Sequence, residues 1–349
     1  MDVRQSSLQQ WVHETLSHLS LPTPKGSLEV VSGDASFRRY FRQQVAAGSY
    51  IAVDAPPAKE DNPKFVNIAK AWFAQGVAVP QVIHCDFTQG FMLLSDMGDQ
   101  LLLPLLEEKT ADALYEQAMD ALIPIAQINT SLDTNEIQQT LPLYDEALLE
   151  QEMSLFRDWF LIEHLKLELT SQDERILKET FTLLRESALG QIQVPVHRDY
   201  HSRNLMILDD KSMGIIDFQD AVMGPITYDL VSLLRDCYIQ WPVEKVEEWV
   251  AVYLSKAKKA GLIGAISSGQ FLLWFDWMGM QRHIKVAGIF ARLSIRDGKS
   301  AYLDDIPLTV NYLYQVSGQY AALQEFHEWL RNRLSPHLGF ELIEIEPNQ

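Results

Sequence analysis

The sequence predicts an α+β protein with two lobes, a small β-rich lobe over residues 1–98 and a mainly helical lobe over residues 99–349. A chain of 349 residues exceeds the size at which a single core usually stops growing. Short apolar and aromatic runs separated by turn residues fill the first hundred positions, a pattern typical of strands. After about residue 104 the apolar residues recur with helical spacing instead.

The composition is that of a folded globular protein. Hydrophobic residues make up 47% of the chain and charged residues 22%, both near average values. The formal net charge of -18 repels phosphate backbones and anionic membranes, so we expect neither nucleic acid nor membrane as a partner. Residues 1–100 carry 8 basic and 10 acidic side chains, so the first lobe tolerates an anionic nucleotide, whereas the remainder is strongly acidic.

The cysteines and the apolar runs indicate the compartment. Cys85 and Cys237 are too few and too far apart for a disulfide framework or a Cys-rich zinc site. The first twenty residues lack an apolar signal core, and no run of about twenty apolar residues occurs. We therefore expect a cytoplasmic protein whose partners are small molecules.

The first lobe reads as a helix, three strands, a second helix and two more strands. Residues 6–20 place apolar side chains at helical spacing. Residues 27–57 then read as a meander of three strands with Gly-Asp and Gly-Ser turns. A helix over 61–75 buries a face formed by Phe65, Ile68, Ala69, Trp72 and Phe73. Two strands over 79–98 end the lobe.

The second lobe holds the stretch that carries chemistry, "HRDYHSRN" at 197–204 followed by "GIIDFQD" at 214–220. Two four-residue apolar runs flank a polar turn at 209–212, which predicts a hairpin. If the turn closes symmetrically, Leu208 opposes Met213 and Asn204 opposes Asp217. An amide oxygen and a carboxylate at one end of a hairpin suit Mg²⁺. Asp199, just before them, can accept the proton of an attacking hydroxyl.

The spacing His197, Asp199, Asn204, and then Asp217-Phe218, matches the catalytic loop and metal aspartate of protein-kinase-like enzymes. The continuation "IIDFQDAVMGPITYDLVSLL" more specifically resembles the aminoglycoside phosphotransferase family. The resemblance implies a two-lobed protein-kinase-like fold that uses ATP and Mg²⁺. It also implies structural roles for His197, which holds the loop, and for Asp229, a helix-start carboxylate.

Other segments resemble a narrower branch of that family, the anomeric N-acetylmuramate/N-acetylglucosamine kinases of cell-wall recycling. They are "GDASFRRYFR", "DAPPAKED", "GFMLLSDMG", "YDEALLEQEMSLFRDWF" and "DWMGMQRHIKVAGIFARL", which with the catalytic region span about residues 33 to 293. This resemblance implies phosphorylation of the anomeric hydroxyl of an amino sugar, giving the sugar 1-phosphate, in peptidoglycan recycling.

The nucleotide is assigned to the first lobe. Backbone amides from Gly33 to Ser36 are expected to cradle the phosphates, with Arg38 or Arg39 adding charge. By resemblance, Asp96 and Met97 lie in the linker that pairs with the adenine. The third strand ends in Asp54 where kinases usually carry a lysine, so Lys59 or an arginine of the glycine turn is expected to supply the missing charge.

The acceptor residues are predicted from two helices. Glu152, Phe156 and Trp159 recur at helical spacing, and Glu152 needs a partner on such a face. The later helix carries a stripe with polar neighbours, from which Arg282 is the predicted sugar-binding residue. That stripe comprises Trp274, Trp277, Gln281, Lys285 and Gly288, with Arg282 and His283 beside it. Both patterns also fit ordinary packing.

Three alternatives stay open. The acidic second lobe suits a cationic acceptor such as an aminoglycoside or a choline-like molecule. The missing strand lysine suits a non-catalytic nucleotide-binding homologue. A hydrolytic metal site could be drawn from His197, Asp199, His201 and Asp217, but it leaves Asn204 unexplained.

Overall fold

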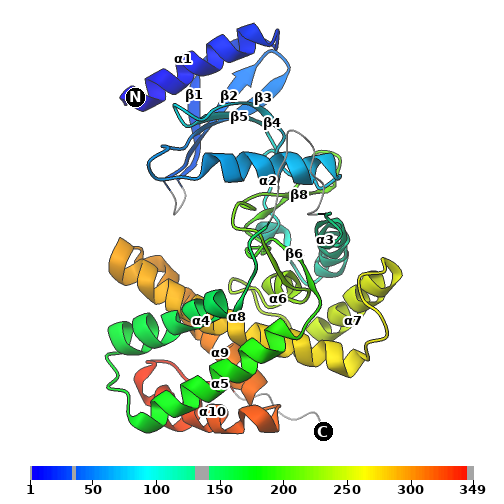
Figure 1. Cartoon of the computed structure of the whole chain (residues 1–349). Helices are drawn as coiled ribbons and strands as arrows, with labels where there is room; N and C mark the ends of the chain where they lie inside the picture. The colour runs from blue at the N-terminus through cyan, green and yellow to red at the C-terminus, as the bar shows by residue number, and fades with distance from the viewer. Residues whose placement is uncertain (1, 34–36, 130–140, 344–349) are drawn as a thin grey trace. The chain divides into compact units, whose positions relative to one another are not determined.

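The computed structural model describes residues 2–33, 37–129 and 141–343 (Figure 1). The chain forms two compact units. The first consists mainly of Met1–Pro104 and Arg203–Asp220, and the second of Leu105–Gln127, Leu141–Ser202 and Ala221–Gln349. The predicted domain boundary after residue 98 stays a prediction.

The first unit is built on a five-stranded antiparallel sheet in the order β1-β2-β3-β5-β4. The predicted meander and the two later strands are confirmed. The strands are β1 (Pro24–Gly33), β2 (Arg39–Val45), β3 (Gly48–Asp54), β4 (Val82–Asp86) and β5 (Phe91–Ser95). The two predicted helices are α1 (Val3–His18) and α2 (Asn62–Ala74), which cover opposite faces of the sheet (Figure 1).

Alternation along the strands sends one set of apolar side chains toward α1. This core joins residues of α1 to residues of four strands: Leu8, Trp11, Val12, Leu16, Leu28, Phe41, Val45, Ala52, Phe91 and Leu93. The α2 face also follows its predicted stripe at Phe65, Ile68 and Trp72, which are buried. Phe73 is 46% exposed, so its predicted place on that face is wrong. It directly follows Trp72, and neighbouring positions lie about 100° apart around a helix.

The second unit is mainly helical, as predicted. Its α-helices are α3 (Ala111–Ala126), α4 (Glu146–Leu155), α5 (Ser171–Leu189), α6 (Tyr228–Leu234), α7 (Val243–Lys259), α8 (Ser268–Asp297), α9 (Ile306–Ser317) and α10 (Gln324–Trp329). Two π-helices, η2 (Phe156–His164) and η5 (Leu330–Leu334), extend α4 and α10. The antiparallel pair β6 (Gln193–Val196) and β9 (Val222–Pro225) flanks the catalytic stretch in sequence. Short 3₁₀ turns are Leu103–Leu105, Ser300–Asp305, Ala321–Leu323 and Ser335–His337.

The change from α-helix to π-helix occurs where α8 crosses. A Cβ added at Gly288 of α8 would lie 2.3 Å from the carbonyl carbon of Leu155 and 2.5 Å from the amide nitrogen of Phe156. Only a glycine therefore permits this approach of the two backbones. The approach fixes α8 against α4 at the end of the segment that carries Glu152.

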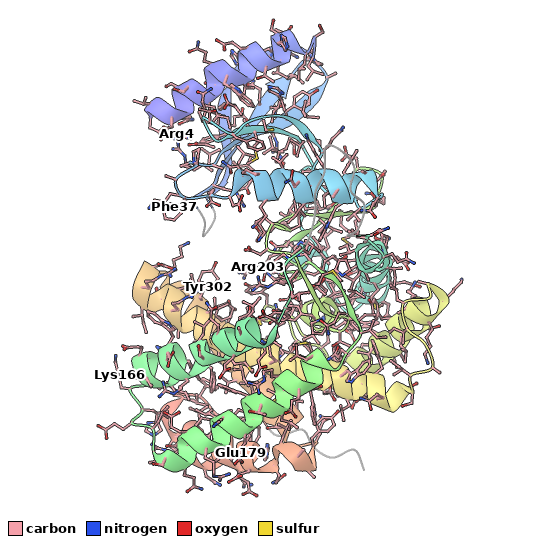
Figure 2. The ribbon with its side chains drawn as sticks, viewed as in Figure 1. Arg4, Phe37, Lys166, Glu179, Arg203 and Tyr302 are labelled. Atoms are coloured by element: carbon pink, nitrogen blue, oxygen red, sulfur yellow. The ribbon has the colours of Figure 1, made fainter. Side chains whose placement is uncertain are left out.

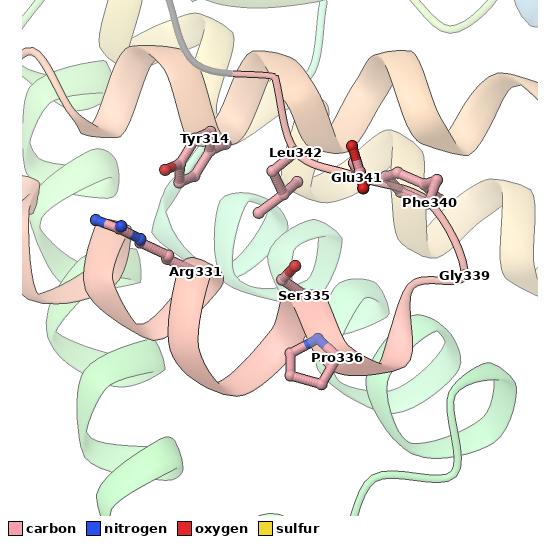
Figure 3. A pocket seen from close by; sticks show the side chains of 8 residues that line it. All are labelled: Tyr314, Arg331, Ser335, Pro336, Gly339, Phe340, Glu341 and Leu342. Carbon is pink, nitrogen blue, oxygen red and sulfur yellow. The ribbon is translucent and has the colours of Figure 1, made fainter.

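A surface pocket lies among the C-terminal helices (Figure 3). Its lining residues are Tyr314, Arg331, Ser335, Pro336, Gly339, Phe340, Glu341 and Leu342. None of them belongs to the predicted catalytic, nucleotide or acceptor set, so the pocket gives no support to those predictions. Among the residues that the structure describes, no helix combines the length and the apolar character needed to cross a bilayer.

Candidate active site

The predicted catalytic hairpin forms with β7 (Leu205–Ile207) and β8 (Met213–Ile215), but its predicted register is wrong by one residue. Ile207, and not Leu208, pairs with Met213. The reason is the turn, because Lys211 adopts a left-handed conformation with φ 70 and its N–H donates to Leu208 O at 2.9 Å. A type I turn followed by one left-handed residue closes a three-residue loop, whereas the prediction assumed four.

Asn204 and Asp217 nevertheless meet at the open end of this hairpin. Ile216 N–H donates to the carbonyl oxygen of Asn204 at 3.1 Å, and the side-chain amide of Asn204 lies 3.5 Å from Asp217 Oδ2. Gln219 Nε2 donates to the other carboxylate oxygen at 2.7 Å. Asp217 has φ 67, a left-handed conformation that is uncommon outside glycine. The pair offers oxygen donors of the kind that Mg²⁺ prefers.

Phe218, the residue after Asp217, packs against α2 and so fixes the position of Asp217. Phe218 is fully buried, and its ring centroid lies 5.0 Å from that of Phe65 and 5.8 Å from that of Trp72. Both partners belong to α2, so packing against this helix directs the segment that follows β8. Lys64 of the same helix reaches Asp220 at 3.5 Å.

Two adjacent arginines point to opposite faces of the sheet. Arg38 is buried, lies 3.2 Å from Glu60, and places its guanidinium 5.1 Å from the centroid of Phe65 on α2. Arg39 pairs with Asp54 through a hydrogen bond of 3.0 Å and with Asp2 at the start of α1. The guanidinium of Arg38 thus lies on the α2 side of the sheet, and that of Arg39 lies on the α1 side.

The Asp54 carboxylate accordingly lies on the face of the sheet that α1 covers. Its side chain is fully buried, and Arg4 of α1, labelled in Figure 2, donates to it at 2.8 Å. It lies two residues from Ala52, which belongs to the core beneath α1. Lys59, the other predicted source of positive charge, places its ammonium 5.2 Å from the centroid of the Phe37 ring.

The remaining nucleotide predictions fall in β1 and after β5. Gly33 ends β1 opposite Arg39, and Ser36 lies outside the described residues. Asp96 is held by Arg42, by Ser49 Oγ at 2.6 Å and by the N–H of Gly98 at 2.9 Å. Its pKa is lowered because, although burial raises it, Arg42 and Ser49 stabilise the carboxylate. Met97 is half-buried, and its terminal carbon would lie 2.6 Å from a Cβ added at Gly214 of β8.

In the second unit, Asp229 fixes the backbone of the predicted catalytic loop. Its carboxylate accepts the N–H of His197 at 2.6 Å and that of Arg198 at 2.9 Å. Arg198 itself has φ 77. The His197 ring lies in an edge contact with Tyr200, and its Nδ1 accepts the N–H of Asp199 at 3.2 Å. These contacts are those expected of the structural roles given to His197 and Asp229.

Two further anchors follow Asp199. The hydroxyl of Tyr200 donates to Ala118 O at 2.8 Å, and Ser202 donates to Asp236 through its N–H at 2.9 Å and its Oγ at 2.5 Å. Burial opposes ionisation of Asp199, yet Lys285 and His201 help to hold its pKa below the ordinary value. Asp199 is therefore a carboxylate at neutral pH, the form that accepts a proton.

Glu152 has the partners that its buried position requires. Arg198 donates to one carboxylate oxygen, and the ammonium of Lys285 lies 2.9 Å from that oxygen. The hydroxyl of Tyr144 donates to the other oxygen, and Gln281 Nε2 donates to the Tyr144 hydroxyl at 3.0 Å. Burial would raise the pKa of Glu152, but Lys285 and Arg198 lower it overall.

This group of Tyr144, Glu152, Arg198, Gln281 and Lys285 is called the Glu152 cluster below. Sequence reasoning identified Glu152 but missed Tyr144, eight residues before it, and Arg198, which lies 46 residues further along the chain. Gln281 and Lys285 were visible as a four-residue repeat on α8, but the prediction selected Arg282 instead. Lys285 also donates to the Tyr228 hydroxyl at 2.9 Å.

Trp159 and Arg282 stand apart from the Glu152 cluster. Trp159 is half-buried in η2 and takes no part in the hydrogen bonds of the cluster among the described residues. A π-helix closes its hydrogen bonds over five residues, so Trp159 leaves the stripe begun by Glu152, and Phe160 is buried instead. Arg282 is buried on α8 and donates to Cys237 Sγ at 3.5 Å.

The hydrolytic metal site is not supported. In residues 2–33, 37–129 and 141–343, no three His, Cys, Asp or Glu side chains gather where they could hold a metal ion. Zinc-type hydrolytic sites are built from three such ligands. The Asn204–Asp217 pair instead resembles a site that draws most ligands from water and phosphate oxygens.

Comparison with known proteins identifies the class. Residues 27–262 match the model of the phosphotransferase enzyme family (APH). The match covers more than half of the chain, so this protein belongs to that family and is a phosphotransferase. Its fold is that of protein-kinase-like enzymes, with a small antiparallel sheet in one unit and a mainly helical remainder, as predicted.

Similar chains narrow the comparison. The N-acetylmuramate/N-acetylglucosamine kinase of Pseudomonas aeruginosa is 42% identical over 334 residues, covering 94% of this chain and 96% of that protein. The protein of the same name from Pseudomonas putida is 40% identical with the same coverage. Among solved structures, Plasmodium vivax ethanolamine kinase has a TM-score of 0.58 at 12% identity, covering 81% of each chain. An ADP-bound aminoglycoside phosphotransferase has 0.54 at 16% identity, covering 85% of this chain and 96% of that one.

Proposed function

We propose that this protein is a kinase that transfers the γ-phosphoryl group of ATP to the anomeric hydroxyl of N-acetylmuramate or N-acetylglucosamine, releasing the sugar 1-phosphate. The observation that carries the proposal is sequence identity: over 94% of its length, this chain is 40–42% identical to kinases named for these sugars. The position of the phosphate on the sugar follows from the sequence resemblance described above.

In this proposal Asp199 orients the acceptor hydroxyl and takes its proton as the oxygen attacks the γ-phosphorus. The carboxylate is ionised, which the role requires. Asp229 and Ser202 act indirectly, because their hydrogen bonds hold the backbone on either side of Asp199. Arg198 and Lys285 add positive charge around it, and Glu152 fixes both cations.

Asn204 and Asp217 are the residues that would hold Mg²⁺. Bound there, the ion would neutralise charge on the nucleotide phosphates. The left-handed backbone of Asp217 and the buried ring of Phe218 direct the carboxylate, since Phe65 and Trp72 leave Phe218 little room to turn.

Arg38 is the proposed substitute for the missing strand lysine. A kinase lysine pairs with a glutamate of the helix in the small lobe. Arg38 makes an equivalent ion pair with Glu60, next to α2, and rests on Phe65 of that helix. Arg39 is excluded from this role because its charge is directed to Asp54 and Asp2 on the α1 side.

The reaction is tested by ³¹P NMR of the protein with MgATP and each sugar. We expect a sugar 1-phosphate signal that Asp199→Asn reduces by about 10²–10⁴ in rate, the usual loss on removing a general base. Asp158→Asn is the matched control, because Asp158 is about half exposed and pairs only with Arg157 among the described residues. A phosphosugar of another linkage would contradict the anomeric assignment, and no phosphosugar would contradict the proposal.

The nucleotide assignment is tested with two neighbouring arginines. Arg38→Gln should lower kcat/KM for ATP by about 10–100-fold, because a hydrogen bond to a charged group is worth about 1.5–3 kcal/mol. Arg38→Lys should recover part of the loss. Arg39→Gln should leave kcat/KM for ATP within about threefold. Equal losses in the Arg38 and Arg39 variants would exclude Arg38 as the specific substitute.

A cationic acceptor has one observation in its favour, the shared fold with ethanolamine and aminoglycoside kinases. Against it stand Arg198, Arg282 and Lys285, three buried or nearly buried cations in the unit that carries Asp199. Like charges in a low-dielectric site repel strongly. Phosphorylation of an aminoglycoside or choline in preference to the two sugars would reverse this ranking.

A further inference from the structure

Arg282 differs from the other buried cations of the described chain. Four lysine or arginine side chains are less than 9% exposed: Arg38, Arg235, Arg282 and Lys285. Three of them form close ion pairs, Arg38–Glu60 at 3.2 Å, Arg235–Asp276 at 2.5 Å and Lys285–Glu152 at 2.9 Å. Arg282, only 4% exposed, has no carboxylate within ion-pair distance among the residues that the structure describes, and its hydrogen bond there is to Cys237 Sγ at 3.5 Å.

Such an arrangement is unfavourable unless an anion completes it. A buried guanidinium without a paired charge loses the hydration that it has in water. A buried sulfur is a weak acceptor and cannot restore that loss. Among the residues that the structure describes, the protein therefore retains a buried guanidinium that no carboxylate pairs with directly.

The surroundings of Arg282 connect it to the catalytic loop. It lies one turn before Lys285 on α8, the residue that joins the Glu152 cluster to Tyr228. Burial would lower the pKa of Arg282, but neighbouring groups, Cys237, Tyr228, Asp236 and Asp199, raise it. The positive charge of Arg282 therefore interacts electrostatically with Asp199, the carboxylate that is proposed to accept the substrate proton.

We propose that Arg282 binds an anionic oxygen group of the reactants. This inference rests on the proposed function. The two acceptor sugars differ in charge, because N-acetylmuramate carries a lactyl carboxylate that N-acetylglucosamine lacks. The planar guanidinium matches a carboxylate in a two-point contact, and it matches a phosphoryl group equally well. The anion is thus either the carboxylate of N-acetylmuramate or the phosphoryl group in transfer.

The test compares Arg282→Gln with the unmodified full-length protein on both sugars. Initial rates with saturating MgATP give kcat and KM for each sugar, and thermal unfolding gives Tm. Arg296→Gln, an exposed position of the same helix that pairs with Asp297, is the matched control and should change none of these values.

Two results support the inference and identify the anion. If kcat/KM falls at least tenfold more for N-acetylmuramate than for N-acetylglucosamine, the carboxylate is bound. If kcat falls at least tenfold for both sugars, with unchanged KM and a Tm that is equal or higher, the phosphoryl group is bound. An equal or higher Tm is expected, since the substitution removes an unbalanced buried charge.

Every other result overturns it. Kinetics within twofold for both sugars would mean that Arg282 binds no reactant. Equal losses for both sugars with a lower Tm would mean that it only supports the fold. Failure of the proposed function is recognised separately, because the unmodified protein would then phosphorylate neither sugar.

Discussion

Asp54 in the first unit and Glu152 in the second are both buried carboxylates that hold two cations. Asp54 holds Arg4 and Arg39, whose side chains are 40% and 38% exposed. Glu152 holds Arg198 and Lys285, which are only 17% and 8% exposed. The cations that pair with Asp54 in the first unit are therefore partly solvated, whereas those that pair with Glu152 in the second unit are mostly surrounded by protein.

The difference shows what each arrangement is for. Water screens the pairs of Asp54 and can solvate its arginines if they are released, so the pairs serve as a clamp between α1 and the sheet. The cations of Glu152 cannot reach water as easily, so the carboxylate is needed to keep them in place. Because Arg198 precedes Asp199 directly, Glu152 orders the loop that carries the proposed catalytic base.

Removal of Glu152 should have the largest effect. Glu152→Ala leaves two buried cations uncompensated and should lower the free energy of unfolding by about 3–5 kcal/mol. Urea denaturation measures this loss. Glu150→Ala is the control on the same helix, since Glu150 is 68% exposed and lies 3.5 Å from Arg185. It should cost less than about 1 kcal/mol. Similar losses in both variants would abolish the contrast with Asp54.

A second substitution disrupts the packing of α8 against α4, which brings Lys285 to Glu152. Gly288→Ala should cost about 1–3 kcal/mol and reduce kcat, because its Cβ would collide with the backbone of Leu155 at 2.3 Å. Gly269→Ala, in the first turn of α8 where nothing lies within 4 Å of the added carbon, should be neutral or slightly stabilising. Urea denaturation compares the two, and a neutral Gly288→Ala would show that the helices can separate.

Asp229 provides a third buried carboxylate to compare with Asp54 and Glu152, because backbone N–H groups hold it in place of cations. Burial raises its pKa to about 7, although the N–H groups of His197 and Arg198 lower it. The native state then binds an extra proton between about pH 4 and pH 7, so this group's contribution to stability falls as pH rises through that window.

The difference in unfolding free energy between the unmodified protein and Asp229→Asn should therefore decrease by about 2 kcal/mol from pH 5 to pH 7. Urea denaturation at several pH values measures it. The carboxylates with cationic partners behave oppositely, since the lowered pKa values of Glu152 and Asp96 make their contributions disappear only as pH falls. Parallel pH curves for the two proteins would refute the prediction for Asp229.

Asp54 should give the smallest effect. Asp54→Ala releases two arginines that are already partly solvated, so we expect a loss of about 1 kcal/mol in unfolding free energy. The value of kcat/KM for ATP should stay within about threefold, because Asp54 faces α1. A loss as large as that of Glu152→Ala would mean that exposure of the cations does not decide the strength of these pairs.

Much of the fold was readable from local patterns. Turn residues and alternating side chains placed all five strands of the sheet, and helical spacing placed α1 and α2. The hairpin register was missed by one residue, since whether Lys211 adopts a left-handed conformation is not visible in residue type. The helix predicted to carry Glu152, Phe156 and Trp159 changes from an α-helix to a π-helix at Phe156, where α8 crosses.

The sequence by itself determined the chemical groups of the candidate site, because Asp199, Asn204 and Asp217 lie within one short stretch whose spacing carries a family resemblance. Only the tertiary structure decided which charges balance one another. Gln281 meets Tyr144 across 137 positions, and Arg198 meets Glu152 across 46. Electrostatic pairing depends on distance and burial in the folded chain, and neither is set by residue type or by local spacing.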